Sequence, residues 1–289
     1  MHPAITRRKA QLGAALVPFA DRLAAAEPAA AARLAAIEKE SGGRLGVAAL
    51  DTGNGRLIAR RPGERFPLCS TFKFLAAAAV LRLVDMGKVR LDRKTPYGAK
   101  DLMSYAPVTK AHVGEGGMSL GDLCAAAIDW SDNTAGNLLL RTVGGPRGFT
   151  RYARSLGDHV TRLDRTEPSL NSALPGDARD TTTPRAMLRD MQVLLLGPAL
   201  SSPSRRQLEQ WLIGDQVGAQ RLRAGFPSSW QIGDKTGSGD NGTANTIAIV
   251  WPPDRAPLLV AVYLTGATVA ADARNAVHAE VARLLAKTF

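Results

Sequence analysis

The chain has 289 residues, of which 45% are hydrophobic and 22% are charged. This composition excludes a largely disordered protein and allows one large domain or two interleaved ones with a sizeable core. The formal net charge of +11 raises nucleic acid as a partner. However, the basic residues are scattered, with no zinc-finger spacing and no aromatic-rich basic stretch, so we expect no nucleic-acid binding.

The first 26 residues have the pattern of an export signal. Arg7, Arg8 and Lys9 form a basic start, "AQLGAALVPFA" is a modest apolar stretch, and "LAAA" offers small residues suited to cleavage. The arginine pair also fits the twin-arginine route. Because charged residues at 21–22 interrupt the apolar part, an amphipathic extension is the alternative. We expect an exported protein, periplasmic or secreted, and no later segment is long and apolar enough to span a membrane.

Strand patterns lie at both ends of the remaining chain, and helical patterns lie between them. Apolar spacing predicts a helix over 29–42, followed by a strand, a Gly-containing turn and a second strand over 44–61. Between about 70 and 214, helical patterns divided by glycine and proline predominate. β-branched and aromatic runs then predict strands over 229–237, 243–253 and 256–266, before an amphipathic helix over 271–289.

This order predicts a discontinuous α/β domain into which a helical domain is inserted. The expected boundaries place 1–26 in the signal, 27–66 and 215–289 in the α/β domain, and 67–214 in the all-α domain. Ligands usually bind in the cleft between two domains, so we expect the functional site there.

Cysteine and histidine residues do not form a metal-binding pattern. The two cysteines, Cys69 and Cys124, could form one disulfide, but their spacing alone leaves the pairing open. The four histidines are dispersed and match no metal motif, so we expect each to be a surface or packing residue and predict no metal. They are His2, His112, His159 and His278.

A serine stands three residues before a lysine in "PLCSTFKFLAAAAVL", at the start of an apolar run. On a helix, Ser70 and Lys73 lie one turn apart on the same face. The serine could be a helix N-cap beside an ordinary surface lysine. It could also be a nucleophile with an amine positioned to take its proton.

Two further motifs follow along the chain. "SDN" at 131–133 precedes an apolar helical run, where helix capping alone would explain it. "KTG" at 235–237 ends a predicted strand, where a Gly-rich hairpin turn would explain it. Together and in this order, the three motifs resemble those of class A β-lactamases and penicillin-binding proteins.

A fourth element favours the first of these two families. The polar stretch 162–184 contains "EPSLN" at 167–171, which resembles the ExxLN motif on the omega loop of class A β-lactamases. Penicillin-binding proteins lack this glutamate. The chain, from about residue 30 to 289, is therefore similar to a class A serine β-lactamase, with cefotaximase-type members closest. That resemblance implies a five-stranded antiparallel sheet flanked by N- and C-terminal helices, beside an all-α domain with the omega loop at about 162–180.

The resemblance implies a catalytic role for five residues. Ser70 attacks the lactam carbonyl, and whether Lys73 or Glu167 takes its proton stays open. Glu167 then activates the water that attacks the ester, and Asn171 helps to hold that water. Ser131 relays a proton to the departing lactam nitrogen. A neutral Lys73 needs a lowered pKa, which we expect nearby cations to supply.

The resemblance also implies a substrate-binding set. The backbone N–H groups of Ser70 and Ser238 form the oxyanion hole. A glycine in "KTG" keeps the strand edge open, and Tyr105 stands at the cleft mouth, with a packing tyrosine as the alternative. An ion pair between Arg165 and Asp180 closes the neck of the omega loop. The expected binding residues are Tyr105, Asn133, Arg221, Lys235, Thr236, Gly237 and Ser238.

The chain departs from the family at an arginine and at its cysteines. Many relatives carry an arginine where this chain has Ala244, and Arg221 aligns with a substitute whose guanidinium reaches the same pocket; a helix-surface charge is the alternative. Where relatives place disulfide partners for the two cysteines, this chain has Gly239 and Ala77. Both thiols are therefore expected to be free and buried.

The expected activity is hydrolysis of penicillins and cephalosporins by a monomer without a cofactor. Two rivals stay open: a DD-peptidase or esterase of the same superfamily that only acylates, and a non-catalytic β-lactam-binding sensor domain.

Overall fold

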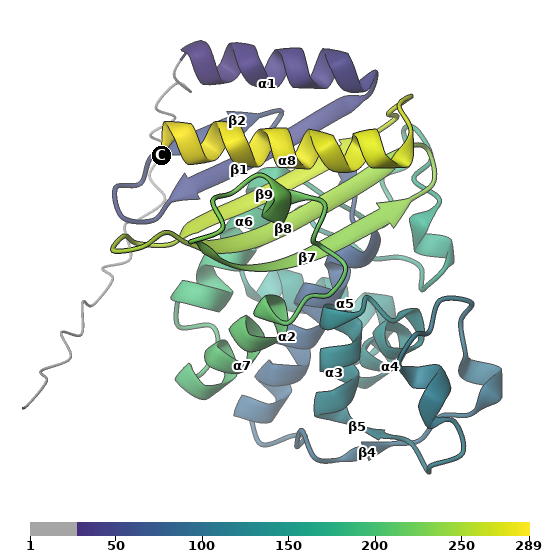
Figure 1. Cartoon of the computed structure of the whole chain (residues 1–289). Helices are drawn as coiled ribbons and strands as arrows, with labels where there is room; N and C mark the ends of the chain where they lie inside the picture. Colours follow the sequence, from purple (N-terminus) through teal and green to yellow (C-terminus); the bar gives the residue numbers. More distant parts are fainter. Residues whose placement is uncertain (1–27) are drawn as a thin grey trace, which may run out of the picture.

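The computed structural model describes residues 28–289, so the expected export signal lies outside the described residues. A five-stranded antiparallel sheet with the order β2-β1-β9-β8-β7 joins segments from both ends of the chain (Figure 1). Its central strand is β9, in which Val262 stands opposite Val47 of β1 and Thr246 of β8. The strands are β1 (Arg44–Asp51), β2 (Leu57–Arg60), β7 (Gln231–Gly239), β8 (Thr243–Trp251) and β9 (Leu258–Thr265).

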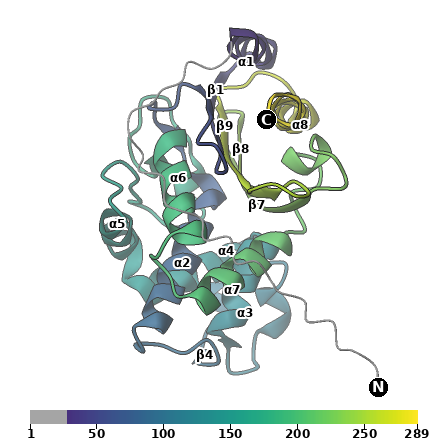
Figure 2. The same ribbon diagram turned by 90° about the vertical axis from the view of Figure 1, so that its left-hand side faces the viewer.

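Both faces of this sheet are covered by helices. Side chains alternate between the faces of a strand, so Val260 and Val262 pack with α1 (Pro28–Ser41) and α8 (Ala271–Thr288). On the other face, Tyr263 packs into a second core shared with the helices of the middle of the chain. Figure 2 shows α1 and α8 on one side of the sheet and α6 on the other. Burial on both faces explains why all eight residues of β9 are buried.

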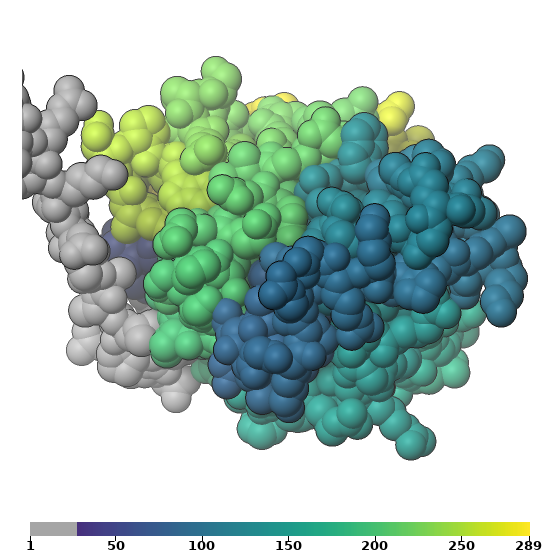
Figure 3. All heavy atoms as spheres, turned by 90° about the horizontal axis from the view of Figure 1, so that it is seen from below, coloured from purple at the N-terminus to yellow at the C-terminus, as the bar shows by residue number. Residues whose placement is uncertain are grey.

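The middle of the chain forms a helical layer around one central helix. All residues from Phe72 to Leu81 of α2 are buried, and its alanines allow neighbouring helices to approach closely. Figure 3 shows the end of this layer, where the residues after α2 lie against those of α7; Asp85 there accepts a hydrogen bond from the N–H of Ser201 at 2.8 Å. The helices are α2 (Phe72–Asp85), α3 (Leu120–Asp129), α4 (Asn133–Val143), α5 (Gly145–Ser155), α6 (Pro184–Met191) and α7 (Ser202–Ile213).

Two short strand pairs within this layer were not predicted. β3 (Phe66–Pro67) pairs with β6 (Thr181–Thr182), and β4 (Lys94–Thr95) pairs with β5 (Met118–Ser119). The first pair joins the segment before α2 to the end of the loop over 162–180. It therefore ties the serine at 70 to the loop that carries the glutamate at 167.

The predicted fold class is confirmed, while the domain boundaries stay a prediction. The helical run predicted after "SDN" is present as α4, and Ser131 before it has a φ of 55°, in the left-handed region. Among residues 28–289, no helix is both long and apolar enough to cross a membrane.

Candidate active site

Ser70 and Lys73 meet at the start of α2. Ser70 lies in a short 3₁₀ turn over Cys69–Thr71, and Lys73 Nζ donates to Ser70 Oγ at 2.9 Å. The Ser70 hydroxyl in turn donates to Glu167 Oε1 at 3.2 Å. It caps no helix, since no side chain caps either this turn or α2. The N-cap interpretation of Ser70 is therefore wrong, and its hydroxyl lies between an amine and a carboxylate.

The three residues of the "SDN" motif have different roles, because one caps a helix and the other two contact Lys73. Asp132 is the N-cap of α4, where its Oδ1 accepts from the N–H of Ala135 at 2.9 Å. Its neighbours face Lys73 instead: the carbonyl of Ser131 accepts from Lys73 Nζ at 2.8 Å, and Asn133 Oδ1 accepts at 2.7 Å. Helix capping thus explains only the middle residue of the motif.

Strand β7 brings the "KTG" motif against the serine. Lys235 is fully buried, and its Nζ donates to Ser131 Oγ and to the carbonyl of Thr236, both at 2.9 Å. A Cβ on Gly237 would lie 3.1 Å from the backbone nitrogen of Ser70. The glycine therefore favours the close approach of β7 to the serine turn.

Glu167 and Asn171 lie on the loop over 162–180, with Glu167 only 3% exposed. Glu167 Oε1 is 3.1 Å from Lys73 Nζ, and its Oε2 accepts a short hydrogen bond from Asn171 Nδ2. The carboxylate is thus held from two sides beside Ser70 Oγ.

Asn137 is a site residue that the sequence analysis missed. From α4, its Oδ1 accepts from the N–H of Glu167 at 2.9 Å, and its Nδ2 donates to the Glu167 carbonyl at 3.0 Å. The available signal was its position four residues after Asn133, which places both amides on one helix face.

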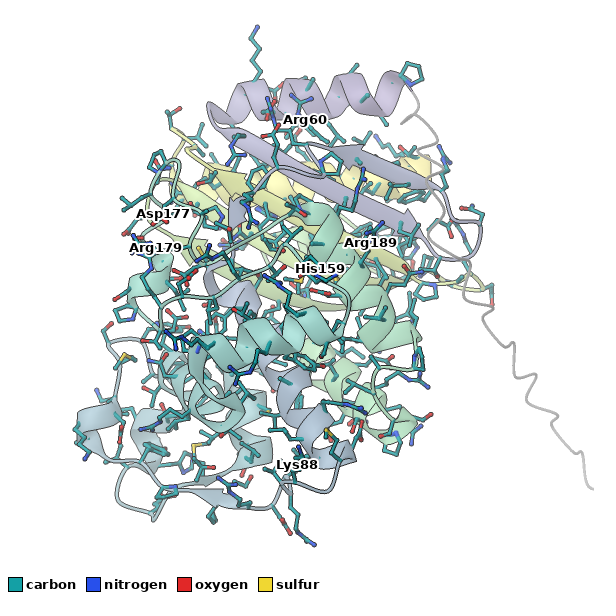
Figure 4. All side chains as sticks on the ribbon, turned by 180° about the vertical axis from the view of Figure 1, so that it is seen from behind. Arg60, Lys88, His159, Asp177, Arg179 and Arg189 are labelled. Atoms are coloured by element: carbon teal, nitrogen blue, oxygen red, sulfur yellow. The ribbon has the colours of Figure 1, made fainter. Side chains whose placement is uncertain are left out.

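An ion pair joins the two ends of the loop over 162–180. Arg165 Nε lies 2.5 Å from Asp180 Oδ2, while Asp180 Oδ1 accepts from the N–H groups of Asp164 and Arg165 at 2.7 and 2.9 Å. Asp180 is 1% exposed. On the outer side of the loop, the half-buried Asp177 and the exposed Arg179 form a second pair at 2.8 Å (Figure 4).

Arg221 reaches the strand that carries the "KTG" motif. Its guanidinium donates to the carbonyl of Gly237 at 2.8 Å, to Ser238 Oγ at 2.7 Å and to Asn275 Oδ1 of α8 at 2.9 Å. Burial lowers the pKa of Arg221 to about 10. The alternative of a free helix-surface charge is wrong.

Tyr105 and the two cysteines occupy opposite environments. The Tyr105 side chain is 47% exposed, so it is not a core packing residue. Cys69 and Cys124 are both free and buried, as predicted. A Cβ on Gly239 would lie 2.7 Å from Cys69 Sγ, so this glycine leaves room for the unpaired thiol.

Burial controls the charges of the two site lysines. It lowers the pKa of Lys73, and the Glu167 carboxylate opposes this shift. Burial also lowers the pKa of Lys235 to about 7. The sequence analysis attributed the lowered pKa of Lys73 to nearby cations, but its main cause is desolvation, and its contacting charge is an anion. Within residues 28–289, no cluster of three His, Cys, Asp or Glu side chains is arranged to hold a metal ion.

Comparison with known proteins places this arrangement in a family. Residues 29–289 match the family model described as Beta-lactamase enzyme family. The beta-lactamase AST-1 of Nocardia asteroides is 50% identical over 240 residues, covering 83% of this chain and 77% of that protein. CTX-M-8 of Citrobacter amalonaticus is 50% identical over 240 residues, covering 83% and 82%.

The solved structures agree with the sequence matches. An ancestral class A β-lactamase, GNCA, superposes with a TM-score of 0.89 at 60% identity, covering 90% of this chain and 100% of that one. The resemblance drawn from the four motifs is therefore confirmed. The family model matches nearly the whole described chain, and the sequence relatives are 50% identical to it. This protein therefore belongs to the class A β-lactamases.

Proposed function

We propose that the protein hydrolyses penicillins and cephalosporins through an ester on Ser70. One observation carries the proposal: the Ser70 hydroxyl is hydrogen-bonded both to Lys73 Nζ at 2.9 Å and to Glu167 Oε1 at 3.2 Å. A nucleophile needs a base within hydrogen-bond reach. Here two bases contact it, and each is positioned to take its proton in acylation.

The oxyanion formed in this attack needs two backbone donors. We assign them to Ser70, next to the start of α2, and to Ser238 on β7. The close packing of β7 at Gly237 supports this assignment, because it brings the strand edge beside the serine turn. Donors of this kind typically lower the barrier by several kcal/mol.

Opening of the lactam ring needs a proton on the departing nitrogen. Ser131 Oγ is the donor in our proposal, supported by its contact with Lys235 Nζ at 2.9 Å. Lys73 also contacts the carbonyl of Ser131 at 2.8 Å. Lys235 Nζ, which donates to Ser131 Oγ, is positioned to replace the proton that this hydroxyl gives to the nitrogen.

Deacylation separates a hydrolase from a protein that only acylates. Glu167 is the base for the attacking water in our proposal, and Asn171 helps to hold that water. The support is geometric: the Glu167 carboxylate contacts Ser70 Oγ, and Asn171 Nδ2 donates to its other oxygen. Asn171 Oδ1 is a buried acceptor without a protein partner among the described residues, so it can accept from that water.

Substrate recognition combines cations with hydroxyls. β-Lactams carry a carboxylate, and we assign it to Lys235, Thr236 and Ser238. The Arg221 guanidinium donates a hydrogen bond to Ser238 Oγ at 2.7 Å, and in our proposal it replaces the arginine missing at Ala244. Asn133 Oδ1 is engaged by Lys73, so its Nδ2 is the group that donates to the amide of the substrate side chain. The exposed Tyr105 forms the cleft mouth.

A chromogenic cephalosporin and benzylpenicillin, assayed with wild type beside Ser70→Ala and Glu167→Ala, test the proposal. Wild type turns both over, Ser70→Ala does not, and Glu167→Ala accumulates an adduct whose mass locates it on Ser70. A long-lived adduct on the wild-type protein would instead identify the acylating DD-peptidase or esterase. Full function of Ser70→Ala would identify the sensor domain.

We also infer export and a monomeric state. The export inference is supported by the basic and apolar pattern of the first 26 residues. Cell fractionation, with Arg7 and Arg8 both changed to lysine, tests the twin-arginine route, and sedimentation tests the monomer.

A further inference from the structure

Lys235 is buried without a direct ion pair. Its Nζ donates only to Ser131 Oγ and to the Thr236 carbonyl among residues 28–289, and both acceptors are uncharged. An ammonium taken out of water in this way loses its proton unless negative charge lies nearby. What keeps this lysine charged must therefore act from a short distance without touching it.

Two buried aspartates provide that charge. Asp234 precedes Lys235 on β7, and its Oδ1 accepts from Arg223 Nε at 2.6 Å. Asp215 follows α7, and its Oδ1 accepts from the N–H of Val217 at 2.9 Å. Both side chains are buried, and the carboxylates of Asp215 and Asp234 both oppose the lowering of the Lys235 pKa.

The remaining oxygens of the two carboxyl groups face the same point. A Cβ on Gly218 would lie 2.1 Å from Asp234 Oδ2 and 2.5 Å from Asp215 Oδ2. The distance between the two oxygens therefore cannot exceed the sum of these two distances. Both are buried, and neither has a hydrogen-bond partner among the described residues. Only glycine at 218 leaves room for this meeting.

Two ionised carboxylates cannot remain in that arrangement at low cost. They repel each other, and each leaves a buried acceptor without a donor. A single proton between them removes one charge and supplies the missing hydrogen bond. Consistent with this, burial and the neighbouring Asp215 raise the pKa of Asp234 to about 7, and burial raises the pKa of Asp215.

We propose that Asp215 and Asp234 share one proton and act as a positioning pair that holds a single negative charge behind Lys235. The pair raises the fraction of Lys235 that is an ammonium, which is the form that meets the anionic group of the substrate. This inference rests on the proposed function, in which Lys235 meets the β-lactam carboxylate.

The pKa of Lys235 depends on the charged groups that surround it. Lys73 and Arg221 are cations and lower its pKa further, while the two aspartates raise it. Arg223 pairs with Asp234, and the half-buried Asp129 carries a pKa raised to about 7 by burial and by Asp215. The groups come from α2 (Lys73), α3 (Asp129), the segment between α7 and β7 (Asp215, Arg221, Arg223) and β7 (Asp234).

Asparagine substitutions separate a shared proton from two independent charges. In Asp215→Asn or Asp234→Asn, the amide NH₂ replaces the shared proton and one negative charge remains. We therefore expect each single variant to keep the Lys235 pKa within about half a unit of wild type. The double variant loses the charge, so its Lys235 pKa falls by at least about one unit. NMR of lysine labelled with ¹³C at Cε follows this titration in the resting protein, with Lys235→Arg to assign the signal.

Infrared spectra count the proton directly. At pH 6, each single asparagine variant should lose one protonated-carboxyl C=O band, whereas the exposed control Asp254→Asn should lose none. Retention of the band in both single variants would overturn the shared proton. A single variant that lowers the Lys235 pKa as much as the double variant would overturn it as well. If the double variant does not fold, the infrared and NMR results of the single variants still decide.

Kinetics connects the pair to the substrate. At pH 7 the double variant should raise KM for benzylpenicillin at least about fivefold, because a fall of one unit in the Lys235 pKa from about 7 reduces the protonated fraction by that factor, with the single variants within threefold of wild type. An unchanged KM in a folded double variant would overturn the positioning role. Absence of turnover in wild type would instead refute the proposed function, and the NMR and infrared measurements would still test the pair.

Discussion

The side chain of Asn137 holds the main chain of Glu167 from both sides. Its amide oxygen accepts from the Glu167 N–H, and its amide nitrogen donates to the Glu167 carbonyl. The carboxylate is thereby anchored to α4, a helix, although it lies on a long loop. The position of Glu167, the base in the proposed deacylation, therefore depends on this side chain as well as on the loop.

Replacing Asn137 should therefore slow deacylation more than acylation. In Asn137→Ala both hydrogen bonds are lost, and a displacement of Glu167 should lower kcat for benzylpenicillin by about 10- to 100-fold. Stopped-flow mass spectrometry should show the acyl-enzyme accumulating. The control Asn54→Ala, in the turn between β1 and β2, should keep wild-type kcat. Equal losses in the rates of acylation and deacylation would contradict a role specific to Glu167.

Asp180 should be the more important of two aspartates on the omega loop. Asp180→Asn keeps a residue type that tolerates its left-handed φ of 55° but removes the charge facing Arg165. We expect a loss of about 1–3 kcal/mol in the free energy of unfolding, since its acceptors are buried. Urea titration measures this loss. The same change at the half-buried Asp177, which pairs with the exposed Arg179, should shift the midpoint less, and equal midpoints for both variants would refute the assignment.

Removing Arg221 should weaken substrate binding. Its guanidinium supports Ser238 and the carbonyl of Gly237, so Arg221→Ala leaves both without their charged donor. Charged hydrogen bonds are worth about 1.5–3 kcal/mol, which corresponds to a rise in KM of about ten- to a hundredfold for a carboxylate-bearing β-lactam. Steady-state kinetics beside Arg283→Ala, an exposed arginine of α8, provides the comparison. A KM within twofold of the control would show that Arg221 does not contribute to substrate binding.

His278 should make the protein less stable in acid. Burial lowers its pKa from 6.5 to about 3, and its Nε2 contacts the Ala244 carbonyl at 3.1 Å. Between these pKa values the unfolded chain binds the extra proton, so the free energy of unfolding falls as pH drops below 6.5, by up to about 1.4 kcal/mol per pH unit.

The substitution His278→Gln removes this proton while keeping an N–H donor. Denaturant titrations between pH 4 and 7 should therefore show a shallower acid slope than wild type. His159→Gln, at an exposed position labelled in Figure 4, should keep the wild-type slope. A steep slope that survives in His278→Gln would assign the acid sensitivity to other groups.

The two thiols should be inert in the folded protein. Burial raises the pKa values of Cys69 and Cys124 well above their usual range, and only the thiolate reacts readily. Iodoacetamide at pH 8 should label neither cysteine in the native state and both in guanidinium chloride, as counted by mass spectrometry. Rapid labelling of native Cys69 would show that the serine turn opens.

The strands, most helices and the main motifs could be predicted because their signals are local. Alternating or continuous apolar runs mark β1 and β9, and three short motifs mark the sides of the site. The left-handed φ of Ser131 could not be predicted, because helix capping alone would explain the "SDN" motif. Only the left-handed φ of Ser131 turns that residue toward Lys235 while Asp132 caps α4.

Contacts between distant segments were beyond sequence reasoning. Asn137 looks like any polar residue on a helix until the omega loop is laid against it. The meeting of Asp215 with Asp234 depends on a glycine whose neighbours come from two elements. The pKa of Lys73 likewise needed burial to be known, since the sequence indicated cations but not the loss of water.

The central place of β9 has a consequence for synthesis of the chain on the ribosome. β1 and β2 emerge early and β7 and β8 late, yet neither hairpin has its inner neighbour until residues 258–265 appear. A nascent chain thus exposes two open strand edges, which are sites of aggregation. Assembly of the sheet, and with it the joining of Ser70 to Lys235, can finish only after translation has nearly ended.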